Sequence, residues 1–132
     1  MEASTEHAPI RVLMMPRDTN PSGTIFGGVI LSYIDMAGGE EAKLQGAERV
    51  VTVAMKEVVF HKPVFVGDLV SFYTSLVDVG RTSLTVRVSV RAARYWDRGE
   101  VVKVTEAEMT YVNVNPDRKP VPIRPARTQL SE

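Results

Sequence analysis

The strongest constraint on the fold is one segment, residues 28–45, with the sequence GVILSYIDMAGGEEAKLQ. Its apolar residues recur at helical spacing, and in the first half they surround the helix axis on nearly all sides. A helix of this kind is buried inside a protein, whereas a surface helix is apolar along one stripe only. The second half turns polar at Glu40, Glu41 and Lys43, and we expect both glutamates on a solvated face, with Gly46 as a C-terminal stop. The rest of the chain must therefore wrap around this helix.

The rest of the chain has the character of β-strands. A short apolar run at residues 10–15 precedes the helix, and four longer segments rich in β-branched residues follow it. In residues 82–90 the side chains alternate clearly, with aliphatic residues from Leu84 to Val90 on one face. Breaks that contain glycine or proline separate the four segments, so we expect an antiparallel meander joined by tight turns. The four segments are residues 49–60, 69–79, 82–96 and 100–114.

These elements predict an α+β fold in which a five-stranded antiparallel sheet wraps around one long central helix. One helix cannot cover both faces of such a sheet, and the sheet edges remain open to a further partner. We therefore expect the protein to form an oligomer.

Length and composition exclude several classes of protein. The 132 residues suffice for one domain, and 16 basic residues balance 16 acidic ones, so no overall positive field would draw the chain to nucleic acid. The absence of cysteine excludes disulfides, thiolate catalysis and Cys-based zinc sites, and no spacing of His, Asp and Glu resembles a metal site. The longest apolar run, residues 29–37, is far shorter than the roughly 20 residues that span a bilayer. We expect a protein that does not bind membranes.

Both ends of the chain are predicted to be tails. Residues 1–9 are polar and lack the basic start and apolar centre of a signal peptide. Residues 116–132 contain four prolines and are expected to be extended. A cytoplasmic protein is the expectation from these features.

Asp35 is the residue that fits its surroundings least. It lies in the middle of the helix, in the most apolar part of the chain, where a carboxylate needs a partner. Helical spacing places Gly28, Ser32 and Gly39 on its face, so one stripe combines small side chains with an acid. Such a stripe permits close approach of a ligand or of another backbone. The alternative is a structural aspartate that hydrogen-bonds Ser32 or a neighbouring strand.

The six residues that lead into the helix, Gly23 to Gly28, read GTIFGG. Glycines at a helix start leave backbone N–H groups free to point at an anion or at a developing oxyanion. The alternative is a tight turn in which the glycines only avoid a steric clash.

Two further groups are candidates for binding a ligand. His61 and Lys62 end a strand, where ordinary surface residues are also common. Arg81, Thr82 and Ser83 bring a guanidinium, two hydroxyls and turn amides together, which suits a phosphate. More often, arginines along strands form a solvated face.

With these residues in view, the chain resembles the hotdog-fold acyl-CoA thioesterases, close to the bacterial short-to-medium-chain acyl-CoA hydrolases and the cytosolic acyl-CoA hydrolases of animals. The most specific block is residues 15–39, where D-T-N, G-x-I-F-G-G and a helix-borne aspartate occur in that order. The resemblance covers residues 10–115, which we take as the thioesterase domain. Weaker blocks are residues 49–73, 79–90 and 104–114.

The resemblance implies that two subunits pair sheet edge to sheet edge, that dimers assemble into hexamers, and that the active site lies at the dimer interface. The family's helix acid falls on Asp35, and the amide that polarises the thioester carbonyl falls on Gly27 or Gly28. Thr24 stands where the family often has an Asn or Asp from the opposite subunit. A threonine hydroxyl can hydrogen-bond water but cannot act as a carboxylate base.

The resemblance also assigns the contacts to coenzyme A. The F-H-K-P turn with His61 and Lys62, and the G-R-T-S turn with Arg81, Thr82 and Ser83, would hold the phosphates and the pantetheine. Apolar side chains near the helix start and the following strand are candidates for the wall of the acyl chain. They are Ile25, Phe26, Met55 and Val58.

We therefore expect hydrolysis of acyl-CoA to free fatty acid and CoA, without a metal or redox cofactor. Asp35 would act as a general base on water or attack the thioester to form an anhydride, and the sequence leaves both routes open. The main alternative is a non-catalytic acyl-CoA binding or sensor protein of the same fold, because Thr24 is not a carboxylate. A dehydratase would need a histidine near the Gly-Gly helix start, and neither His7 nor His61 is near it in sequence. A purely structural oligomer would leave Asp35 as a packing residue.

Overall fold

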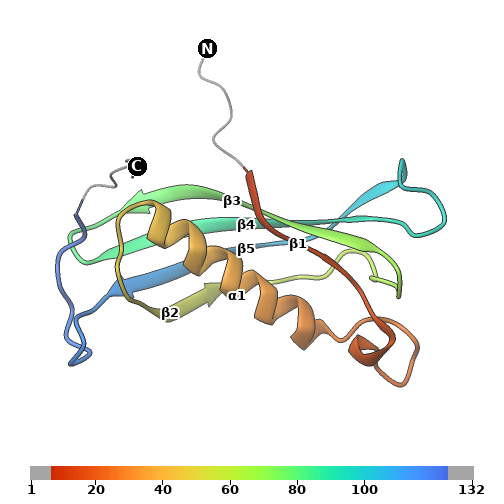
Figure 1. The fold of residues 1–132 in the computed structure, drawn as a ribbon, viewed down its shortest axis with the longest axis horizontal. Coiled ribbons are helices and arrows are strands. Elements are labelled where there is room, and N and C mark those ends of the chain that lie inside the picture. Colours follow the sequence, from red (N-terminus) through yellow and green to blue (C-terminus); the bar gives the residue numbers. More distant parts are fainter. Residues whose placement is uncertain (1–6, 125–132) are drawn as a thin grey trace, which may run out of the picture.

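The computed structural model describes residues 7–124. Within this range the chain forms one α-helix, one short 3-10 helix and five strands (Figure 1). In chain order they are β1 (His7–Leu13), η1 (Pro16–Asp18), α1 (Gly27–Leu44), β2 (Val50–Lys56), β3 (Leu69–Val79), β4 (Ser83–Ala93) and β5 (Val101–Asn113).

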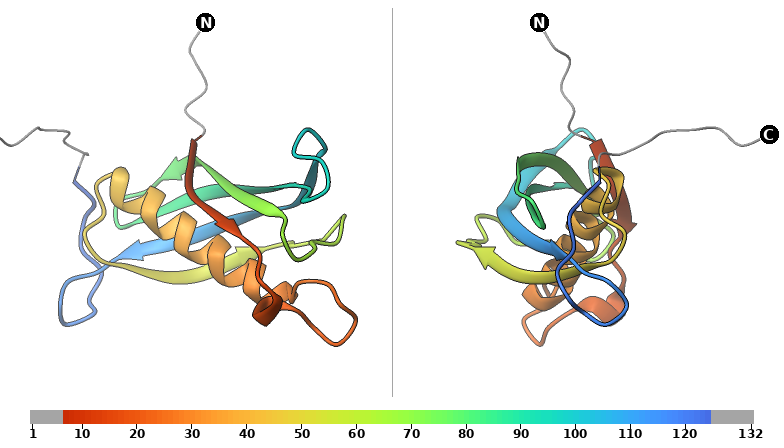
Figure 2. Two further views of the ribbon diagram at one scale, coloured as in Figure 1. Left: turned by 45° about the vertical axis from the view of Figure 1, so that its right-hand side comes forward. Right: turned by 90° about the vertical axis from the view of Figure 1, so that its left-hand side faces the viewer.

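The five strands form one antiparallel sheet in the order β1-β3-β4-β5-β2. Figure 2 shows the sheet curling around α1, which crosses its concave side. This architecture is the hotdog fold, and it confirms the predicted α+β arrangement of a five-stranded sheet around one central helix.

The predicted four-strand meander is wrong for β2. Only β3, β4 and β5 follow one another as neighbours, whereas β2 pairs with β5 at the far edge of the sheet. The stretch after β2 stays beside β5, since the Thr105 hydroxyl donates to the Val59 carbonyl at 2.6 Å and His61 N donates to the Val104 carbonyl at 2.8 Å. The chain then crosses to β3, so the H-K-P-V-F-V-G-D break is a long connection and not a tight turn.

The strand and tail boundaries also differ from expectation. β1 begins at His7, so part of the predicted N-terminal tail belongs to the sheet, paired with β3. After β5 the chain folds back, with Val121 N donating to the Asn113 carbonyl and Ile123 N to the Arg81 carbonyl, each at 2.9 Å. The first part of the predicted C-terminal tail is therefore hydrogen-bonded to the domain. The remainder of both predicted tails lies outside the described residues.

The core lies between α1 and the concave face of the sheet. Ile30 and Ile34 of α1 are at most 1% exposed, and they meet the inward-facing residues of the strands. Full burial of each such side chain contributes roughly 1.5–3 kcal/mol. The predicted alternation in β4 is confirmed, because Leu84, Val86, Val88 and Val90 are all buried.

The helix is not covered on every side within one chain. Ser32 and Met36 face outward, and Met36 is 49% exposed. Conversely, Glu41 was expected on a solvated face and is only 3% exposed. Its carboxylate accepts hydrogen bonds from the Thr74 hydroxyl at 2.9 Å and from the Gln45 amide at 2.6 Å, which allow its burial. Among residues 7–124, no helix is long and apolar enough to cross a membrane.

Candidate active site

Asp35 lies on the outer side of α1, with Gly28 and Ser32 exposed on the same side and Gly39 partly covered. The Ser32 hydroxyl donates to the Val29 carbonyl at 2.7 Å, so it serves its own helix and does not hold Asp35. The partners of Asp35 come from the sheet instead. The small-residue stripe thus leaves an acid accessible from outside the helix.

Two hydroxyl groups hold the Asp35 carboxylate. Thr52 of β2 donates to Oδ1 at 2.7 Å. Tyr111 of β5 shares its single hydroxyl proton between the Asp35 carbonyl at 2.8 Å and Oδ1 at 3.2 Å. Both donors therefore meet at Oδ1, while Oδ2 accepts no hydrogen bond from residues 7–124. Burial, followed by the neighbouring charge of Asp35, raises the pKa of the Tyr111 phenol well above its ordinary value, so this donor stays protonated.

A hollow of about 450 Å³ opens beside this carboxylate. Its wall combines apolar side chains with the polar groups of α1 and β2. The residues around it are Ile10, Asp35, Met36, Gly39, Glu40, Lys43, Val50, Thr52 and Tyr111. Such a mixture can accept an acyl thioester beside a reactive carboxylate.

The start of α1 forms a second hollow, of about 300 Å³. The helix begins at Gly27 after Phe26, whose side chain makes no capping hydrogen bond. Within the described chain, the Gly27 and Gly28 N–H groups have no hydrogen-bond partner, as expected for a helix N-terminus that can face an anion. Residues of the F-H-K-P turn line the other side. The lining residues are Thr24, Ile25, Gly27, Ile30, Phe60, His61, Lys62, Pro63 and Val64.

Thr24 stands at the rim of the helix-start hollow. Its hydroxyl accepts a hydrogen bond from the Asn20 side-chain amide at 3.0 Å, and its N–H donates to the Asn20 side-chain oxygen at 3.2 Å. The Thr24 hydroxyl proton remains available to a ligand. Phe26 is 47% exposed beside it.

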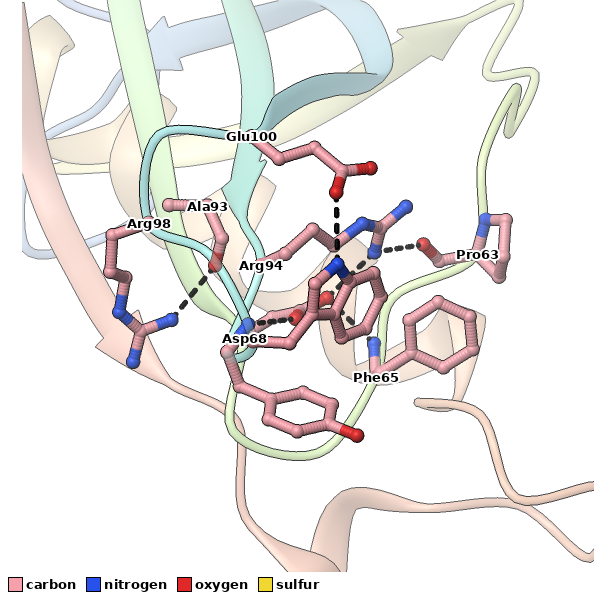
Figure 3. Close-up of polar contacts among 9 residues, drawn as sticks. Pro63, Phe65, Asp68, Ala93, Arg94, Arg98 and Glu100 are labelled. Atoms are coloured by element: carbon pink, nitrogen blue, oxygen red, sulfur yellow. Dashed lines mark hydrogen bonds and ion pairs between the residues drawn. The ribbon is translucent and has the colours of Figure 1, made fainter.

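A buried ion pair fixes the wall formed by the F-H-K-P turn (Figure 3). Asp68 accepts hydrogen bonds from Arg94 Nη1 at 2.7 Å, Phe65 N at 2.9 Å and Tyr95 N at 3.1 Å. Arg94 Nη1 also donates to the Pro63 carbonyl at 2.9 Å. The pair is almost fully enclosed and ties the segment after Lys62 to the end of β4.

The two hollows are separate within one chain, and no residue lines both. Asp35 follows Gly27 by eight residues in the same helix, a separation of about 12 Å at 1.5 Å per residue. One thioester cannot touch both groups of the same chain. The predicted acid and the predicted amides thus form two half-sites.

The G-R-T-S turn lies elsewhere. Ser83 pairs with Val112 at one end of β5, whereas His61 bonds to Val104. Eight residues of strand correspond to roughly 26 Å at 3.3 Å per residue. Arg81, Thr82 and Ser83 are therefore at the other end of the sheet from His61 and Lys62 of the same chain.

Among residues 7–124, no group of three or more His, Asp or Glu side chains is placed to hold a metal ion. The chemical resources of the site are a carboxylate, hydroxyl groups, free helix amides and nearby cations.

Known proteins resemble this chain in both sequence and fold. Residues 22–94 match the family described as the thioesterase superfamily. The acyl-CoA thioester hydrolase YciA of Salmonella typhimurium is 41% identical over 116 residues, which is 86% of this chain and 87% of that protein. A hexameric hotdog fold thioesterase of Campylobacter jejuni superposes with a TM-score of 0.83 at 48% identity, covering 89% of this chain and 90% of the other.

A third relative is the hexameric broad specificity acyl-coenzyme A thioesterase HI0827, solved in a form with an aspartate replaced by alanine. It superposes with a TM-score of 0.85 at 38% identity, covering 89% of this chain and 86% of the other. The chain belongs to the hotdog-fold acyl-CoA thioesterases. Its enzymatic class is acyl-CoA thioester hydrolase, as the resemblance predicted.

The candidate site contains two residues that sequence reasoning missed. Thr52 follows Asp35 by 17 residues and Tyr111 follows it by 76, each on a strand of the sheet. No local sequence pattern connects either residue with Asp35. Gly38 offered the one usable signal, because a glycine inside a helix is unfavourable and often marks a close approach. A Cβ at Gly38 would overlap the Tyr111 hydroxyl, so this glycine makes room for the phenol.

Proposed function

We propose that the thioesterase hydrolyses acyl-CoA at a composite site, with Asp35 from one copy of the chain and the helix start from a second copy. The separation of the two half-sites within one chain is the observation that carries this proposal. A twofold arrangement would set the free Asp35 Oδ2 of one chain opposite the unpaired Gly27 and Gly28 amides of the other. Two such sites would form in each dimer. We place the reaction in the cytoplasm.

The edge strand β2 supports pairing between copies. It has a neighbour on one side only, and its side chains from Val51 to Lys56 are exposed. Val53 is 55% exposed, and Phe60, just beyond the strand, is 42% exposed. An unprotected apolar edge next to both half-sites is suited to association with a second copy. Relatives described as hexameric extend the proposal to a trimer of such dimers.

The proposed chemistry uses groups that the chain supplies. The helix-start amides donate to the thioester oxygen and stabilise its developing negative charge. Asp35 acts through Oδ2. As a general base it takes a proton from water, the new C–O bond forms, the C–S bond breaks, and the proton passes to the departing thiolate. As a nucleophile it would form an anhydride and release the thiolate, and water would then hydrolyse the anhydride.

We assign the F-H-K-P turn and the G-R-T-S turn to the binding of coenzyme A. His61 and Lys62 flank the helix-start hollow and are exposed, so they can reach the phosphates or pantetheine of a bound substrate. Arg81, Thr82 and Ser83 lie too far away to serve the same hollow from the same chain. In an assembly they would serve the site of another copy. The acyl chain would lie against Ile25 and Phe26.

The first experiment measures thiol release from acyl-CoA substrates of increasing chain length, for the wild type and Asp35→Asn. Asn keeps the shape and removes the base, so turnover should fall by about a thousandfold. Folding and CoA binding should stay intact. Equal turnover in both proteins would show that Asp35 is not the reacting group. CoA binding without turnover in the wild type would favour the sensor alternative.

The second experiment mixes two inactive variants. Gly27→Pro removes one helix-start amide, and proline is compatible with the first position of a helix. Gly27→Ala is the matched control, because it retains the N–H and a Cβ there meets Phe60 at an ordinary 3.5 Å. A composite site predicts that Asp35→Asn and Gly27→Pro, refolded together, regain activity, since one site of each hybrid dimer has both native groups. A site within one chain would leave the mixture inactive.

A further inference from the structure

Tyr111 is a buried phenol whose hydroxyl meets Asp35, a partly exposed acid of α1. It is 1% exposed and projects from β5 against the helix. Its hydroxyl lies within hydrogen-bond distance of two oxygens of Asp35, the carbonyl at 2.8 Å and Oδ1 at 3.2 Å. The contact thus joins β5 to both the backbone and the side chain of one helix residue.

We propose that Tyr111 is a positioning residue: it fixes Asp35 by holding its carbonyl and Oδ1, so that Oδ2 is the oxygen presented to the reacting water or thioester. This inference depends on the proposed function, in which Asp35 supplies the reacting carboxylate. An aspartate carboxylate without a donor can rotate about its Cβ–Cγ bond. A donor that contacts Oδ1 and also the carbonyl of the same residue opposes that rotation.

Gly38 shows that the fold makes space for this contact. A Cβ at Gly38 would lie 3.0 Å from Cε2 and from Cζ of Tyr111 and would overlap the hydroxyl. At the next glycine, Gly39, a Cβ would meet only Val50 Cγ2 at 3.8 Å, an ordinary distance. A glycine inside a helix is destabilising by about 1 kcal/mol relative to alanine. Position 38 therefore has a specific steric reason for glycine, and that reason is the Tyr111 hydroxyl.

The electrostatics of the contact favour the ionised acid. A hydroxyl that donates to a carboxylate stabilises its charged form. Burial raises the pKa of Tyr111, so the donor remains protonated while Asp35 is ionised. The other charged groups around the same hollow are Glu40 and Lys43 of α1, whereas β1 and β2 contribute the non-titrating Ile10, Val50 and Thr52.

Tyr111→Phe tests the inference, because it removes the hydroxyl and keeps the ring. We expect kcat to fall about 10- to 100-fold, the size expected for a lost hydrogen bond to a charged group. KM should change less than about threefold, because the variant removes no contact that binds the substrate in its ground state. The pH profile of kcat should also change, because the reacting carboxylate loses a donor. A merely structural role would leave that profile unchanged.

Tyr33→Phe is the matched control. Tyr33 lies on α1, as Asp35 does, and its ring packs on Phe72 at 5.5 Å between centroids. Its hydroxyl has no hydrogen bond within the described part of the chain. This variant should retain the kcat and the pH profile of the wild type. A Tyr33→Phe variant that behaves like Tyr111→Phe would overturn the inference, because any loss of a tyrosine hydroxyl would then have the same effect.

Gly38→Ala provides a second route to the same question if Tyr111→Phe fails to fold. It keeps the phenol but displaces it, so kcat should fall and the pH profile should change as in Tyr111→Phe. If Asp35→Asn abolishes turnover while Tyr111→Phe and Gly38→Ala leave kcat and the pH profile unchanged, the positioning role is wrong and the proposed function stands. If Asp35→Asn also retains turnover, the proposed function itself fails.

Discussion

Asp35 and Asp68 are two aspartates in one domain, with opposite surroundings. Asp68 is fully buried and both of its oxygens are occupied, Oδ1 by Tyr95 N and Oδ2 by Phe65 N and Arg94. Asp35 is partly exposed, and its two donors share Oδ1. A carboxylate with every oxygen paired to the protein holds structure together, whereas a carboxylate with one open oxygen can react. Burial alone would rank Asp68 above Asp35 as a candidate for catalysis, which is the reverse of the order that we propose.

Glu41 extends the comparison to a third acid. It is buried like Asp68, and its two oxygens accept from Thr74 and Gln45. His7 Nε2 lies 3.4 Å from the same carboxylate. By the same reasoning Glu41 is structural, although it is on the same helix as Asp35.

The largest expected effect is on stability at Asp68. Asp68→Ala leaves the buried Arg94 charge without an opposite charge, which should lower the free energy of unfolding by about 3–5 kcal/mol. Asp35→Ala should change it by less than about 1 kcal/mol, because no buried cation depends on Asp35. Urea unfolding of both variants measures the difference. Similar losses would show that the two acids do not differ in structural role.

The next effect comes from removing both partners of the buried pair. Arg94→Met leaves the Asp68 carboxylate with backbone donors only, while adding Asp68→Asn removes the charge as well. The double variant should be about 2 kcal/mol more stable than the sum of the two single losses predicts. A double-mutant cycle by urea unfolding gives this coupling. Additive losses would mean that the pair is not a unit.

The third effect is a pH dependence at Tyr111. Burial and the Asp35 charge raise the pKa of this phenol in the folded protein above its ordinary value of about 10. Below that pH both states keep the proton, so the contribution is constant. Above it the unfolded chain loses the proton and the folded chain keeps it, so stability falls by up to about 1.4 kcal/mol per pH unit. Unfolding measured between pH 9 and pH 11, roughly the range around that pKa, should show a shallower fall for Tyr111→Phe.

The smallest effect is expected at Glu41. Glu41→Gln places an amide group against the Gln45 amide that now donates to it, which should destabilise the protein by about 1 kcal/mol. Adding Gln45→Glu restores a donor–acceptor pair and should recover most of that loss. Thermal unfolding follows both steps, and kcat should not change in either variant. A large loss of turnover with intact folding would place Glu41 among the reacting groups.

Local patterns were sufficient for much of the fold. The helix was expected over residues 28–45 and is found at Gly27–Leu44, because apolar spacing and the flanking glycines are local signals. β3 was expected over residues 69–79 and is found there, and the alternation in β4 marked its buried face. The position of β2 was not predictable in this way. Its neighbour is β5, which starts 45 residues after β2 ends, and no property of β2 alone selects that partner.

The candidate site also combines residues that local patterns predicted with contacts that they did not predict. Helical spacing and an unusual acid pointed to Asp35, and paired glycines pointed to the helix start. The same logic misplaced Glu41, because charge in a sequence indicates solvent unless donors arrive from elsewhere. Those donors belong to Thr74 and Gln45, and the Thr74 hydroxyl lies on another element 33 residues away.

The sequence by itself determined one domain, one mostly apolar helix, a set of β-strands and an acid on a small-residue stripe, since each depends on the spacing of neighbouring residues. Tertiary structure decided the strand order, the enclosure of Asp68 by Arg94, and the two hydroxyls that meet at Asp35 Oδ1. Such features depend on which distant segments pack together, and hydrogen-bond partners are chosen only when that packing is complete.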